Sequence, residues 1–229
     1  MKSVLATLRL FRPVNLLLGA MMVTVTAALV DALNQTDLLM KGIFVVMSFT
    51  AAANAFNDYR DLETDKINRT NRPLPRGDLA PETALILSIL LFMIGVGISF
   101  TINTGAFILA AVVALPLMVV YSLWLKGTIL IGNMIVAVII GLSFVFAGAL
   151  FGELDRMIMP SLLAFGFTMV REFIKDMADA DGDRAAGFIT FPVKFGMEKS
   201  ARIAIFLTVL LMALLVVPYL MNIYSERYL

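Results

Sequence analysis

Seven long apolar runs divide the sequence, and each is long enough to cross a lipid bilayer as a helix. They cover residues 14–33, 38–56, 80–101, 106–125, 129–151, 157–174 and 203–223. The runs are continuous rather than alternating, which predicts helices and not the strands of a membrane barrel. Only 15% of the residues are charged, whereas a soluble domain carries about 25%. We therefore expect an all-α, polytopic transmembrane helical bundle.

The positive charges in the connections predict the orientation of this bundle. Fifteen of the 18 Lys and Arg residues precede the first run, follow the second or fourth run, or lie near the end of the sixth run and beyond it, which places them on one side of the membrane. Cytoplasmic loops carry such an excess of positive charge. We expect the N-terminus and both long charged loops to face the cytoplasm from the cell (plasma) membrane. No stretch is typical of a separate soluble domain, so residues 1–229 are expected to form a single transmembrane domain.

The residue types that are missing limit the chemistry. The chain has no Cys and no His, so thiolate nucleophiles, disulfides and Cys/His metal sites are excluded. Carboxylate and amide oxygens remain as metal ligands, and they suit Mg²⁺ better than Zn²⁺. The net charge of +1 gives no reason to expect a nucleic-acid partner.

Two acidic clusters follow apolar runs. In the first, Asn57, Asp61 and Asp65 recur every four residues and share one helical face, with Asp58 beside it. In the second, which follows the sixth run, Asp176, Asp179 and Asp183 are spaced three and four apart and again share a face, and Glu172 lies one turn before Asp176.

Aligned carboxylates of this kind require an explanation. A pair of solvated loops would account for scattered charges, but like charges one turn apart destabilise a helix, and the pattern occurs twice on one side of the membrane. A divalent cation would neutralise them, and Mg²⁺ typically combines one or two carboxylates with phosphate oxygens of a substrate. The clusters therefore predict two metal sites that hold a diphosphate. A divalent-cation transporter and an assembly protein with solvated loops are the alternatives from other classes.

Three motifs in the sequence resemble those of a known family, the UbiA-type intramembrane prenyltransferases. Their first motif is similar to N-D-x-x-D-x-x-x-D at 57–65 with N-R-P-L-P-R-G at 71–77, and their second matches D-x-x-D-x-x-x-D at 176–183. Between them, Y-S-L-W-L-K at 121–126 resembles a short Tyr/Lys motif. The resemblance implies Mg²⁺-dependent transfer of a prenyl group, in which a prenyl diphosphate loses diphosphate and an acceptor captures the allylic cation.

The resemblance also implies roles for individual residues. The metal and diphosphate ligands would be Asn57, Asp61, Asp65, Asp176, Asp179 and Asp183, with Asp58 as a further metal ligand beside the first three. Arg72 and Lys126 would contact diphosphate oxygens directly, and Tyr121 would lie close to the reacting end of the substrate. With no His present, the base that accepts the acceptor's proton stays open between Asp58, Glu63, Asp65 and a diphosphate oxygen.

The resemblance also implies an acceptor, because R-E-x-x-K-D-x-x-D-x-x-G-D at 171–183 most resembles the digeranylgeranylglyceryl phosphate synthases of this family. These enzymes transfer geranylgeranyl to geranylgeranylglyceryl phosphate and so build an ether lipid. An aromatic or quinone-precursor acceptor is the alternative. An acceptor phosphate needs cations of its own, and the candidates are Arg9, Arg12, Arg171 and Lys175. Arg9 and Arg12 could instead anchor the first helix at anionic headgroups, and Arg171 could instead pair with a carboxylate of the second cluster.

The number of helices departs from the family pattern. Members typically have nine spans, whereas seven are visible in this sequence. Either the last two helices lie outside these 229 residues, or this member is shorter than most. Both acidic motifs are present in either case.

Overall fold

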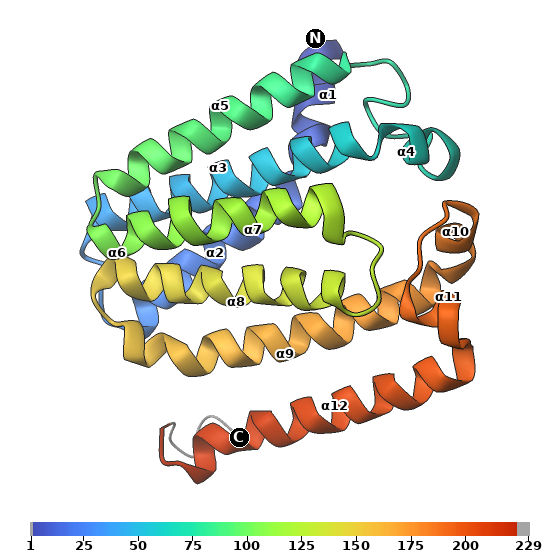
Figure 1. Cartoon of the computed structure of the whole chain (residues 1–229). Helices are drawn as coiled ribbons and strands as arrows, with labels where there is room; N and C mark the ends of the chain where they lie inside the picture. The colour runs from blue at the N-terminus through green and yellow to red at the C-terminus, as the bar shows by residue number, and fades with distance from the viewer. Residues whose placement is uncertain (1, 224–229) are drawn as a thin grey trace. The chain divides into compact units, whose positions relative to one another are not determined.

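The computed structural model describes residues 2–223, and in that range it contains helices and no strand (Figure 1). Within these described residues, six helices are long and apolar enough to cross a membrane, and a bent helix pair near the N-terminus raises the number to seven when the pair is counted as one span. The prediction of an all-α bundle with seven candidate spans is therefore confirmed. The chain divides into two compact units, which are described one at a time.

The first unit comprises Met1–Trp124 and Ser143–Met157. Its helices are α1 (Lys2–Phe11), α2 (Pro13–Leu29), α3 (Thr36–Arg60), α4 (Leu62–Asn68), α5 (Pro81–Phe100), α6 (Thr104–Phe107), the π-helix η1 (Ile108–Ala114) and α7 (Leu115–Val120). The π-helix η2 (Tyr121–Leu125) follows α7, and the unit also contains the second part of α8 (Ile131–Phe151).

Helix α3 forms the centre of this unit, with α2 and α5 packed along it (Figure 1). The rings of Phe49 and Phe92 meet edge to face with their centroids 5.4 Å apart. Gly95 permits this approach, because a Cβ atom there would lie 2.6 Å from the Phe49 ring. The packing fixes α3, and with it the acidic motif that begins at its C-terminal end.

The N-terminal segment changes direction at Arg12. Helices α1 and α2 meet there at an angle of 48°, and Arg12 has left-handed backbone angles, φ 55° and ψ 78°. Pro13 begins α2, a position where its missing N–H costs no hydrogen bond. Leu10 is fully buried in a cluster with Ala55 and Leu74, so α1 packs beside the N-R-P-L-P segment.

The span from Thr104 to Leu125 contains two π-helical stretches, which the sequence did not predict. Pro116 accounts for the first, η1. It cannot donate a hydrogen bond to the carbonyl of Val112, and its ring crowds that carbonyl, so a wider turn ahead of it relieves the clash. The second, η2, begins at Tyr121 and presents the Tyr/Lys motif.

The second unit comprises Leu125–Leu142 and the chain from Ile158 onward. It contains the first part of α8, most of α9 (Leu154–Ala178), α10 (Ala180–Ala185), α11 (Phe191–Phe195) and α12 (Met197–Leu220). The Ser161 hydroxyl on α9 donates to the carbonyl of Gly141 on α8 over 2.9 Å. Phe173 is fully buried against Phe191, with ring centroids 5.6 Å apart. This contact holds α11 against the end of α9 that carries the second acidic motif.

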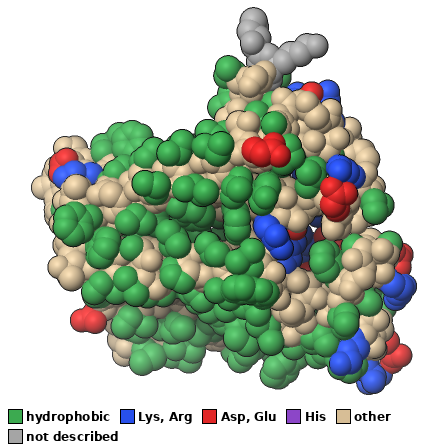
Figure 2. All heavy atoms as spheres, turned by 45° about the horizontal axis from the view of Figure 1, so that its top comes forward, with side chains coloured by type: hydrophobic (Ala, Val, Ile, Leu, Met, Phe, Trp, Pro, Cys, Tyr) green, Lys and Arg blue, Asp and Glu red, His purple; other side chains and the backbone are tan. Residues whose placement is uncertain are grey.

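Large apolar side chains cover much of the face that Figure 2 shows. Leu17, Phe100 and Phe206 are each at least 60% exposed. Contiguous apolar surface of this extent is unfavourable in water and suits contact with lipid.

Candidate active site

The first acidic motif lies where α3 passes into α4. Asp61 separates the two helices, with φ −88° and ψ 2°. The i to i−4 hydrogen bonds nevertheless continue, from the Asp61 N–H to the Asn57 carbonyl over 2.9 Å and from the Asp65 N–H to the Asp61 carbonyl over 2.7 Å. Asn57, Asp61 and Asp65 therefore keep the one-turn spacing that the sequence predicted, across a break that it did not predict.

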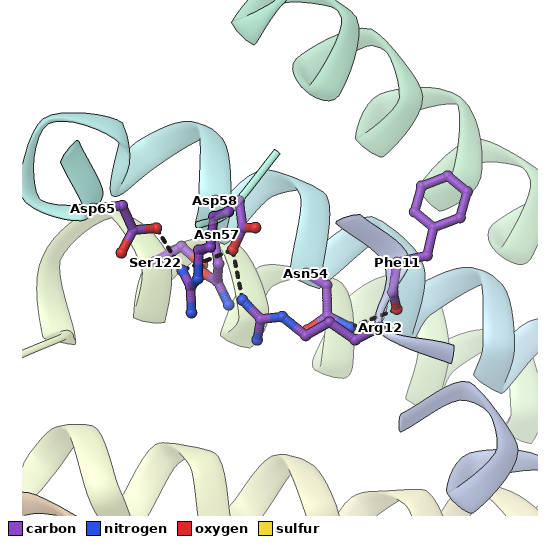
Figure 3. A network of polar contacts seen from close by, with 8 residues as sticks. Phe11, Arg12, Asn54, Asn57, Asp58, Asp65 and Ser122 are labelled. Atoms are coloured by element: carbon purple, nitrogen blue, oxygen red, sulfur yellow. Dashed lines mark hydrogen bonds and ion pairs between the residues drawn. The ribbon is translucent and has the colours of Figure 1, made fainter. Parts of the chain in front are cut away.

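Two arginines hold the buried carboxylates of this motif (Figure 3). Arg12 donates to Asp58 Oδ1 over 2.5 Å. Arg72 donates to the same oxygen over 3.0 Å and to Asp65 Oδ2 over 2.5 Å. The Asp58 side chain is only 3% exposed, so it depends on these partners for the neutralisation of its charge. Burial raises the pKa of Asp65, although the Arg72 guanidinium opposes this effect.

A residue of the π-helix η2 forms a hydrogen bond with the side chain of Asn57. The Ser122 hydroxyl, on η2, hydrogen-bonds the amide oxygen of Asn57 and also lies 2.9 Å from the carbonyl oxygen of Met118. Both Asn57 and Ser122 belong to the first unit, as does the partly buried Tyr121. The Tyr/Lys motif thus begins in contact with the first acidic motif.

The second acidic motif repeats the local geometry of the first. Asp176 is near the end of α9, Asp183 lies in α10, and Asp179 separates the two helices with φ −93° and ψ 3°. The Asp183 N–H donates to the Asp179 carbonyl over 2.9 Å, and Asn133 on α8 donates to Asp176 Oδ2 over 2.8 Å. In both motifs, therefore, the middle aspartate lies at a helix-to-helix junction.

Lys126 lies in the second unit, near the second motif. The Ile189 N–H donates to the carbonyl of Gly127 over 3.1 Å, which ties the Lys126 loop to the segment that follows α10. Burial raises the pKa of Asp183, and the Asp179 carboxylate adds to this rise, whereas the positive charge of Lys126 opposes it. The predicted diphosphate ligand Lys126 is thus within electrostatic reach of a predicted metal ligand.

The four candidates for an acceptor phosphate have different surroundings. Arg9 is exposed in the last turn of α1, and Arg12 is bound to Asp58. Arg171 and Lys175 are exposed on α9, and both form ion pairs with Glu172. For Arg171, the ion pair that the sequence offered as an alternative is therefore present.

The donor set fits a hard cation that completes its coordination elsewhere. Within residues 2–223, no three carboxylates converge closely enough to hold a metal ion by themselves. Mg²⁺ does not require this, because it usually combines one or two carboxylates with waters and substrate phosphate oxygens. Asp61, Asp176, Asp179 and Asp183 are all partly exposed.

Sequence reasoning missed two amides that support the site. Asn54 donates to the carbonyl of Phe11 over 3.0 Å, and Asn133 holds Asp176. Both are buried. The available signal was an isolated amide in or beside an apolar run, since buried polar groups in a membrane span need partners.

These features define a multi-pass helical membrane protein with two acidic motifs of matching local geometry. The sequence profile of the UbiA prenyltransferase family matches residues 17–229. The chain belongs to this family, and it is an integral membrane protein.

Curated relatives and solved structures agree with this assignment. A digeranylgeranylglyceryl phosphate synthase from Methanothermobacter thermautotrophicus is 38% identical over 96% of this chain and 78% of the relative. Another, from Methanopyrus kandleri, is 35% identical over 98% of this chain and 82% of the relative. A solved structure concerned with digeranylgeranylglyceryl phosphate synthase in membranes is 30% identical with a TM-score of 0.81, over 98% of this chain and 80% of that chain. A UbiA homologue from Archaeoglobus fulgidus bound to DMAPP and Mg²⁺ has the same fold, with a TM-score of 0.72 and 20% identity over 97% of this chain and 80% of that chain.

Proposed function

We propose that this protein transfers a geranylgeranyl group from its diphosphate to geranylgeranylglyceryl phosphate, with Mg²⁺ as cofactor. The observation that carries the proposal is the repeated acidic motif, in which Asp61 and Asp179 occupy equivalent helix junctions. The identity to digeranylgeranylglyceryl phosphate synthases supports the same acceptor.

The ligands that we propose for Mg²⁺ and the diphosphate come from both motifs: Asn57, Asp61 and Asp65, and Asp176, Asp179 and Asp183. When bound, the metal draws negative charge from the diphosphate and makes it a better leaving group. Arg72 and Lys126 add N–H donors for the diphosphate oxygens. Tyr121 is proposed to lie near the carbon that reacts, so we assign it with Asp61, Asp65, Asp179 and Asp183 to the catalytic group.

The reaction breaks the bond between the first prenyl carbon and the diphosphate oxygen, and it forms an ether bond to the acceptor hydroxyl. Diphosphate leaves, and the hydroxyl proton passes to a base. Asp65 is one candidate for that base. Asp58, Glu63 and a diphosphate oxygen are the other candidates. The phosphate of the acceptor is assigned to Arg9, Arg12, Arg171 and Lys175.

We also propose that the chemistry occurs at the cytoplasmic face of the plasma membrane within one transmembrane domain. The support is the asymmetric placement of Lys and Arg. Both acidic motifs follow spans that end on the side with this positive excess.

An acceptor screen tests the proposed function. Purified protein in lipid nanodiscs would receive radiolabelled geranylgeranyl diphosphate and Mg²⁺, with geranylgeranylglyceryl phosphate or an aromatic acid as acceptor. We expect the labelled ether lipid, and we expect its loss when EDTA removes the metal. Transfer only to the aromatic acid would overturn the choice of acceptor, and no transfer to either would overturn the proposed enzyme class.

A further inference from the structure

Two residues on one face of α3 form hydrogen bonds with the bend between α1 and α2. Arg12 adopts left-handed backbone angles there, which are uncommon for a residue other than Gly and persist where the surroundings fix them. Asn54 and Asp58 lie one turn apart on α3. Asn54 donates to the backbone carbonyl of Phe11 over 3.0 Å, and Asp58 accepts from the Arg12 side chain over 2.5 Å (Figure 3).

The Asp58 carboxylate joins two distant cations at one oxygen. Oδ1 accepts from Arg12, 46 residues away, and from Arg72, which lies 14 residues further along the chain. Arg72 reaches on to Asp65. Two carboxylates and two guanidinium groups therefore alternate in one network whose formal charges cancel.

This network places Asp58 poorly for binding a metal ion, because its Oδ1 already accepts from two guanidinium groups, whereas Asp65 accepts from one. A cation at its Oδ1 would have to displace two charge-assisted hydrogen bonds and would be repelled by two guanidinium groups. The hydrogen bonds from Arg12 and Arg72 point instead to a role for Asp58 in positioning these two side chains.

We propose that Asp58 is a positioning residue, which holds Arg12 and Arg72 together as a pair that binds phosphate oxygens. A guanidinium has five N–H donors, so one shared carboxylate oxygen leaves further donors on both side chains. Arg12 is 34% exposed and Arg72 is 19% exposed, whereas Asp58 is buried. The carboxylate thus lies behind the arginines and fixes them, and the accessible part of the network is cationic.

This inference rests on the proposed function, and it leaves open whether the phosphate belongs to the prenyl diphosphate or to the acceptor. Asp58→Asn tests it, because the amide keeps the shape of the side chain and loses the charge. We expect the KM of at least one of the two substrates to rise about tenfold, as for the loss of a charge-assisted hydrogen bond. A rise for the acceptor alone would assign the pair to the acceptor phosphate, and a rise for the prenyl diphosphate alone would assign it to the diphosphate. We expect the Mg²⁺ concentration at half-maximal rate to stay within about twofold of the wild-type value.

Two controls separate a positioning role from metal binding and from folding. Asp61→Asn should raise the half-maximal Mg²⁺ concentration, and Asp78→Asn, which disrupts the 3.1 Å ion pair with Arg76, should change neither KM. If Asp58 acts through Arg12, then Asp58→Asn combined with Arg12→Gln should raise KM no further than Arg12→Gln alone.

Binding of Mn²⁺, followed by electron paramagnetic resonance, gives a readout that does not require turnover. We expect Asp58→Asn to bind Mn²⁺ as the wild-type protein does. Weaker Mn²⁺ binding by Asp58→Asn, an unchanged or lower KM for both substrates, or additive losses in the double variant would overturn the inference. A wild-type protein without prenyl transfer would contradict the proposed function instead, and the Mn²⁺ comparison would still decide whether Asp58 is a metal ligand.

Discussion

Asn57 shows how one side chain in the first motif depends on its neighbour. The Ser122 hydroxyl has a single proton but contacts both the Asn57 amide and the Met118 carbonyl. If it donates to Met118, it can only accept from Asn57, whose amide would then present nitrogen to Ser122 and oxygen to a metal. Amide orientation is assigned from such networks, so under the proposed function Ser122 would decide which Asn57 atom faces the metal.

Removing this hydroxyl should therefore weaken catalysis without weakening the fold. Ser122→Ala is expected to lower the rate at fixed Mg²⁺ about tenfold, the size typical for a residue that orients a metal ligand. Excess Mg²⁺ should restore part of the loss. Ser161→Ala, which removes a hydroxyl bonded to a carbonyl within the second unit, is the matched control and should keep the wild-type Mg²⁺ dependence. Equal effects of the two substitutions would contradict the assignment.

The spacing of the aspartates could be read from the sequence, because helical periodicity is local. The partners of Asp58 could not be predicted, since Arg12 lies 46 residues away. Periodicity placed Asp58 beside a ligand face and suggested a metal role. The ion pairs favour a different role for it, which substitution of Asp58 can test.

At the scale of elements, the Lys126 loop and the segment after α10 form one joined structure. Gly127 has φ +73°, and a Cβ atom there would lie 2.5 Å from the Phe188 ring. Gly187 has a similar φ of +76° but open space around it. Both glycines therefore have a positive φ that other residues rarely adopt, but only Gly127 is packed closely against another side chain.

This pair allows a controlled test of the packing. Gly127→Ala should lower the free energy of unfolding by about 1–3 kcal/mol more than Gly187→Ala, because only the first adds a steric clash to the backbone strain. Chemical denaturation in detergent, followed by circular dichroism, measures both. Combining Gly127→Ala with Phe188→Ala should recover part of the difference. Equal destabilisation by the two single substitutions would show that Phe188 does not restrict the loop.

The helices themselves were predictable, because a bilayer requires long apolar runs with internally satisfied backbones. The breaks at Asp61 and Asp179 and the π-helical turns were not. Neither Asp61 nor Asp179 is next to a Pro or Gly that would mark a break, and η2 hydrogen-bonds through Ser122 to Asn57, which is 65 residues away.

At the scale of the whole molecule, the proposed orientation follows from loop charge alone. The protein contains no Cys, so an introduced Cys is the only site that a maleimide can label. Gln35 and Thr70 are both exposed and lie beyond opposite ends of α3. In intact cells, a membrane-impermeant maleimide should label Gln35→Cys and should label Thr70→Cys only after lysis. The reverse pattern would contradict a cytoplasmic N-terminus.

The central claim is that both acidic motifs act on the same prenyl diphosphate. The most direct measurement is the initial rate of ether-lipid formation, by mass spectrometry, for the wild-type protein, Asp61→Ala and Asp179→Ala in nanodiscs with Mg²⁺. The account predicts ether lipid from the wild-type protein and a loss of at least about a hundredfold in each variant, since each removes a ligand that acts on the departing diphosphate. Helical content and unfolding temperature should stay close to those of the wild type. A folded Asp61→Ala or Asp179→Ala variant that keeps the wild-type rate would contradict the claim.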